Sequence, residues 1–118
     1  MIYFVGIHHK PGLPALCSTT RSGKKIDAVI LRMRWECKKM NLFSTDCIPQ
    51  GSSEYWAEHK KFVDNVPDGS TIVLLGKAVD RHFPASFYLR SKIIRTRHPA
   101  FSRASFVDDL VKLIITAI

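Results

Sequence analysis

Five polar residues that could do chemistry follow predicted strand ends in this 118-residue sequence. They are His8, His9, Lys10, Asp46 and His98. A neutral imidazole can accept or donate a proton near neutral pH, a carboxylate accepts hydrogen bonds, and a lysine amine can bind an anion or act as a nucleophile. Brought together, these groups could perform general acid–base chemistry. Whether they meet depends on the elements that position them.

Four largely apolar segments predict β-strands, and a helical pattern follows each of them. The strands are predicted at residues 2–6, 42–45, 71–75 and 92–96. The third of them is apolar almost throughout, which is typical of a central parallel strand that is buried on both faces. The first ends at Gly6 and leads into a polar turn that contains Pro11 and Gly12.

Helices are predicted where apolar residues recur at a spacing of three or four. Ser22 would cap the first helix, Ser52 or Ser53 would cap the second, and the others are predicted at residues 77–83 and from 102 or 103 to 118. Right-handed β–α crossovers then predict one α/β domain over residues 1–118. Its expected architecture is a three-layer α/β/α sandwich with a four-stranded parallel sheet.

In such a sheet all strands end at one edge, and this edge is where α/β proteins bind ligands. Three segments that follow predicted strands should meet there, at residues 6–12, 45–49 and 97–100. The five polar residues would therefore surround one cleft.

The charge of the chain points to a polyanionic partner. Eighteen Lys and Arg residues against ten Asp and Glu residues give a formal net charge of +8. No long basic amphipathic helix or membrane-length apolar run is present, which argues against a membrane. Three widely spaced cysteines without a CxxC pair favour reduced thiols in the cytoplasm over a disulfide framework or a metal site; they are Cys17, Cys37 and Cys47.

Four short motifs occur in a characteristic order along the chain. They are Gly6 with Pro11-Gly12, Arg21-Ser22-Gly23-Lys24 at the start of a helix, Leu75-Gly76-Lys77 after the central strand, and His98-Pro99-Ala100. In type and order these motifs resemble those of the uracil-DNA glycosylase superfamily, and the second and third are similar to its iron–sulfur branch. Three ill-spaced cysteines cannot supply the four ligands of that cluster, so we expect a small, atypical member without a cofactor or a metal ion.

The resemblance implies a role in DNA repair by base excision. Such a hydrolase flips a base out of the stack and hydrolyses the N-glycosidic bond of uracil or another modified base in DNA. By its match to the last motif, His98 would donate a hydrogen bond, as a neutral imidazole, to the departing base. Gly6, Asp46 and Phe43 would bind the base: Asp46 stands where relatives carry a base-reading asparagine, and Phe43 could stack on the base or pack in the core.

The first motif departs from the superfamily pattern. It is two residues longer between Gly6 and Pro11, and it lacks the acidic or amide residue that commonly orients the attacking water. His8 or His9 could replace that residue as a general base.

The expected partner is DNA, single- or double-stranded, bound by a monomer. The predicted nucleic-acid contacts are Lys10, Arg21, Lys24, Arg97 and Arg103, together with Phe101 as a wedge between bases. Two other functions fit the same residues. One is a non-catalytic nucleic-acid-binding module on this fold, and the other is an enzyme that acts on free nucleosides or nucleotides.

Overall fold

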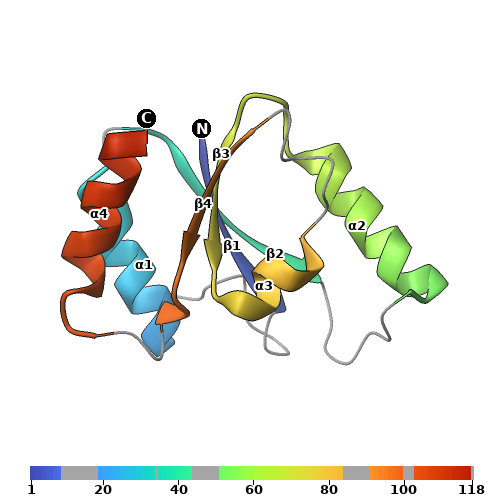
Figure 1. Cartoon of the computed structure of the whole chain (residues 1–118), viewed down its shortest axis with the longest axis horizontal. Helices are drawn as coiled ribbons and strands as arrows, with labels where there is room; N and C mark the ends of the chain where they lie inside the picture. Colours follow the sequence, from blue (N-terminus) through green and yellow to red (C-terminus); the bar gives the residue numbers. More distant parts are fainter. Residues whose placement is uncertain (9–18, 34, 44–50, 84–90, 100–102, 118) are drawn as a thin grey trace.

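The computed structural model describes residues 1–8, 19–33, 35–43, 51–83, 91–99 and 103–117 of the chain (Figure 1). Strands and helices alternate along these residues. The strands are β1 (Ile2–His8), β2 (Cys37–Phe43), β3 (Thr71–Leu75) and β4 (Lys92–Thr96). The helices are α1 (Arg21–Leu31), α2 (Ser53–Asn65), α3 (Lys77–His82) and α4 (Phe106–Ala117).

The four strands form one parallel sheet in the order β2-β1-β3-β4. One row of paired residues runs across it, in which Phe4 lies between Lys39 and Val73, and Val73 pairs with Ile94. The predicted α/β domain with a four-stranded parallel sheet is therefore confirmed. Because the strands are parallel, all four of them end at the same edge.

Residues of the central strands alternate between two hydrophobic clusters, one on each face of the sheet. Ile2 and Phe4 pack with residues of α1 and α4, whereas Tyr3 and Val5 pack with residues of α2 and α3. Figure 1 shows the two helix pairs on opposite sides of the strands. All five residues of β3 are buried, which explains why its sequence is apolar at every position except Thr71.

Helices α1 and α4 bury apolar stripes against the same face. In α4 the buried residues are Phe106, Leu110, Val111 and Ile114, at helical spacing. An exposed ion pair between Arg32 and Asp108 also joins the two helices, and we expect it to add little stability because both charges are largely in water.

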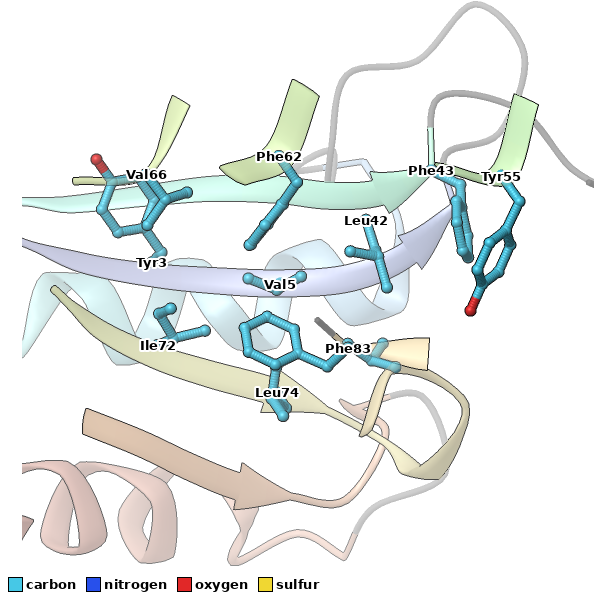
Figure 2. Packing of buried hydrophobic residues seen from close by; sticks show 11 residues of the cluster. Tyr3, Val5, Leu42, Phe43, Tyr55, Phe62, Val66, Ile72, Leu74 and Phe83 are labelled. Atoms are coloured by element: carbon cyan, nitrogen blue, oxygen red, sulfur yellow. The ribbon is translucent and has the colours of Figure 1, made fainter. Parts of the chain in front are cut away.

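On the other face, the cluster is built around aromatic rings of α2 and the end of α3 (Figure 2). The rings of Phe62 and Phe83 meet edge to face with their centroids 5.6 Å apart. This contact joins α3 to the longer helix α2.

Two local predictions are corrected by the structure. Strand β2 begins at Cys37, not at residue 42, because its edge position tolerates polar residues that hide the strand pattern. Lys39, for example, is half-buried and pairs with Asp27 of α1. Helix α1 is capped by Thr20 in place of Ser22, since the Thr20 hydroxyl accepts a 3.0 Å hydrogen bond from the amide of Gly23.

Candidate functional site

The carboxyl edge of the sheet carries the candidate site. The last residues of β1 and β2, His8 and Phe43, are paired there, and Leu75 of β3 pairs with Thr96 of β4. His98 follows two residues after the end of β4. The structure thus brings together the ends of strands that are more than 80 residues apart in the chain, as expected for this topology.

Gly76 forms the turn between β3 and α3 and lies close to His98. Its φ of 106° is a conformation that other residues rarely adopt, and its amide donates a 3.0 Å hydrogen bond to the carbonyl of Thr96. A Cβ atom at this position would lie 3.2 Å from the Cβ of His98. Only glycine therefore allows the β3–α3 turn to approach the histidine this closely.

His98 lies at the surface, yet neighbouring atoms exclude part of its hydration shell. This desolvation lowers the pKa of His98 below the ordinary value of 6.5, because it disfavours the charged imidazolium. The ring is consequently neutral at pH 7 and can donate one hydrogen bond.

We expect Gly76→Ala to lower the free energy of unfolding by about 1–3 kcal/mol, because alanine is strained at this φ. The new methyl group would also press on His98. Urea unfolding measures the loss. Gly69→Ala is the matched control, since Gly69 also has a positive φ of 82° but a Cβ there would meet nothing within 4 Å. Equal losses in the two variants would show that the contact with His98 has no energetic weight.

The lowered pKa of His98 predicts a pH dependence of stability. As the pH falls through 6.5, His98 takes up a proton in the unfolded chain before it does so in the folded protein. The free energy of unfolding therefore decreases until the pH is below the lowered pKa of His98 in the folded protein. His98→Gln should flatten the stability profile just below pH 6.5. Urea midpoints of both proteins at several pH values test this, and an unchanged slope in the variant would contradict it.

An aromatic cluster lies beside the end of β2, which Figure 2 shows with Phe43 next to Tyr55. The ring centroid of Phe43 is 5.4 Å from that of Tyr55 and 5.5 Å from that of His59. Phe43 is only 7% exposed. Its ring is packed in the core, and stacking on a base would require that ring to be uncovered.

Two histidines connect α2 to α3 through this cluster. The buried ring of His59 faces the carbonyl of Tyr55 at 2.9 Å and the carbonyl of His82 at 2.5 Å. Burial raises the pKa of Tyr55, so its hydroxyl keeps its proton and can donate across 3.1 Å to Nδ1 of His82. Sequence reasoning missed this connection. The spacing of Tyr55, His59 and Phe62 on one helical face was the available signal.

Exposed cations lie at the start of α1, where the chain reaches the carboxyl edge. Arg21 and Lys24 occupy the first turn, and no acidic residue accompanies them there. Cations at a helix N-terminus oppose the helix dipole and cost some stability. Helix formation therefore does not explain why these two cations lie at that end.

Arg97 and Arg103, the other two predicted cationic contacts that the structure describes, lie on the α4 side of the site. Both are exposed, and both line a hollow with a volume of about 400 Å³ between the end of β4 and the beginning of α4. The basic residues thus flank the carboxyl edge at both helices of one face.

Several predicted site residues lie outside the described ranges, namely His9, Lys10, Asp46 and Phe101. For His8 the backbone is described, and the structure corrects its expected place. It ends strand β1 and pairs with Phe43, although the sequence placed it in the loop after Gly6. Gly6 itself is half-buried within β1, opposite Asn41.

Within the described ranges, no three His, Cys, Asp or Glu side chains lie together so that they could hold a metal ion. Burial raises the pKa of Cys37, which disfavours the thiolate form that binds metals. None of the described helices has the length and apolar character needed to cross a membrane. Comparisons with protein-family models, with curated proteins and with solved structures found no match to this chain.

Proposed function

We propose that this protein is a uracil-DNA glycosylase-like enzyme, built as a three-layer α/β/α sandwich, that hydrolyses the N-glycosidic bond of uracil or another modified base in DNA. The observation that carries the proposal is the place and the protonation state of His98. It lies at the carboxyl edge of the sheet, in contact with the Gly76 turn, and its lowered pKa keeps it neutral at pH 7. Both residues belong to motifs that resemble those of the superfamily.

The reaction breaks the bond between the sugar and the base, and the bonding electron pair leaves with the base. Negative charge then develops on the carbonyl oxygen of that base. A neutral His98 would donate a hydrogen bond to this oxygen and stabilise the charge, which is greatest in the transition state. Water adds to the sugar carbon, and His8 or His9 would accept its proton.

Charge supports DNA as the substrate. Exposed cations at the starts of α1 and α4 flank the site on one face of the sheet, and the chain has a formal net charge of +8. Of the cations that were predicted to contact nucleic acid, the structure describes four, namely Arg21, Lys24, Arg97 and Arg103. Phosphate contacts of this kind position a strand irrespective of its sequence.

A base-release assay tests the proposal. The protein is incubated with single- and double-stranded oligonucleotides that contain uracil, hypoxanthine or mismatched thymine, and alkali then cleaves any abasic sites. We expect strand cleavage at one or more of these bases. Failure on the whole panel would contradict the proposal. In that case, salt-dependent binding of DNA would indicate a non-catalytic module, and turnover of free nucleosides would indicate the small-molecule enzyme.

A further inference from the structure

The hollow between β4 and α4 has a polar side and an apolar side. Arg95, Arg97 and Arg103 line the first, and Leu110 and Leu113 belong to the second. Leu113 is 44% exposed although it is a large apolar side chain. At about 400 Å³ the hollow is within the usual size range of sites for small ligands.

The cations of this hollow differ in their partners. The guanidinium of Arg95 donates to Asp80 of α3 at 2.8 Å, so that charge is already balanced. Arg97 and Arg103 form no ion pair with any residue in the described part of the chain. Asp109 is the one carboxylate among the described lining residues. Among its described lining residues, the hollow therefore has two guanidinium groups without an ion pair and one negatively charged carboxylate.

A nucleotide matches this arrangement group by group. Guanidinium groups bind phosphate oxygens with paired hydrogen bonds, which makes Arg97 and Arg103 suitable for the phosphate. Asp109 repels a phosphate but accepts hydrogen bonds from a sugar hydroxyl or a base amino group. The exposed face of Leu113 offers apolar contact to the sugar or the base.

We infer that this hollow binds a single nucleotide through its phosphate, next to the site of base excision. Arg97 immediately precedes His98, so the hollow adjoins the segment that carries the proposed catalytic histidine. The inference rests on the proposed function in one respect, because the nucleotide then belongs to the DNA strand whose base is excised. A free mononucleotide would supply the same phosphate chemistry.

Two variants and two matched controls test the inference. The variant Arg97→Gln/Arg103→Gln removes the two cations, and Leu113→Trp fills the hollow without changing the charge. Arg81→Gln/Lys60→Gln removes two exposed cations elsewhere, and Leu31→Trp alters an apolar residue that is 86% exposed. Urea unfolding confirms that each protein is folded. Anisotropy of a labelled single-stranded oligonucleotide and calorimetry with dTMP then measure binding.

We expect the double-arginine variant to bind its ligand roughly tenfold to a hundredfold more weakly, and Leu113→Trp to bind it several-fold more weakly. Both controls should stay close to the unmodified protein. Loss with the oligonucleotide alone identifies a nucleotide of a strand, and loss with dTMP alone identifies a free nucleotide. The inference is overturned if neither probe binds, or if each variant equals its control. The base-release assay tests the proposed function separately. Base excision that is unaffected by the changes at Arg97, Arg103 and Leu113 would refute the nucleotide site in the hollow and leave the proposed function standing.

Discussion

Replacing His98 with alanine is expected to slow base release by about 10²–10³-fold, the usual effect of removing one donor to a developing oxyanion. Desolvation lowers the pKa of the imidazole and so favours its neutral form, and the Gly76 turn lies close to it at the carboxyl edge. Affinity for the oligonucleotide should change by no more than a few-fold, since the hydrogen bond strengthens mainly in the transition state.

Single-turnover cleavage of an oligonucleotide with the favoured base measures this effect. His98→Gln is the informative companion, because its amide can still donate a hydrogen bond and should lose less activity than alanine. For the unmodified protein the rate of base release should fall below pH 6.5, where His98 begins to take up a proton and a histidine that acts as the general base is inactivated by protonation. Equal rates for His98→Ala and the unmodified protein would remove His98 from the mechanism.

Replacing Phe4 with alanine should have the largest effect on stability. Phe4 is fully buried in the middle of the central strand β1, in the cluster that both α1 and α4 cover. Truncation removes its transfer free energy and leaves a cavity that the surrounding strands and helices cannot fill. We expect the free energy of unfolding to fall by about 3–5 kcal/mol.

Urea unfolding monitored by circular dichroism gives this loss. Phe4→Leu retains most of the volume and should cost less than Phe4→Ala. Leu31→Ala is the surface control, because Leu31 is 86% exposed and its truncation should change the free energy of unfolding by about 0.5 kcal/mol or less. A loss at Phe4 as small as that at Leu31 would contradict the two-sided burial of β1.

The accuracy of the predicted strands depended on whether consecutive apolar residues mark the centre of each strand. Strand β3 was located to the residue, at 71–75, because a buried and almost wholly apolar run marks it. Strand β4 was also located to the residue, at 92–96, although it lies at an edge of the sheet, because the pair Ile93-Ile94 stands at its centre. Strand β2, the other edge strand, was located poorly because Lys38, Lys39 and Asn41 interrupt its apolar residues. A polar edge strand has no sequence pattern of its own, and its pairing with β1 decides its extent.

The same distinction applies to the candidate site. That strand ends meet at one edge follows from β–α alternation and the handedness of crossovers, so His98 could be placed there from the sequence. Its contact with Gly76 could not be predicted, because it joins residues on two different strand exits. Nor could the bridge from His59 to the carbonyl of His82, which depends on how α2 packs against α3.

Local pattern and chain connectivity were thus sufficient for the parallel α/β sheet, its central strands and the edge at which chemistry is expected. These features depend on hydrophobic periodicity and on the handedness of the backbone, both of which act within short stretches of chain. The desolvation of His98, the glycine that it contacts and the hollow between β4 and α4 depend on atoms from separate elements. Desolvation and close contact arise only when those elements pack, and for that reason the tertiary structure alone decided them.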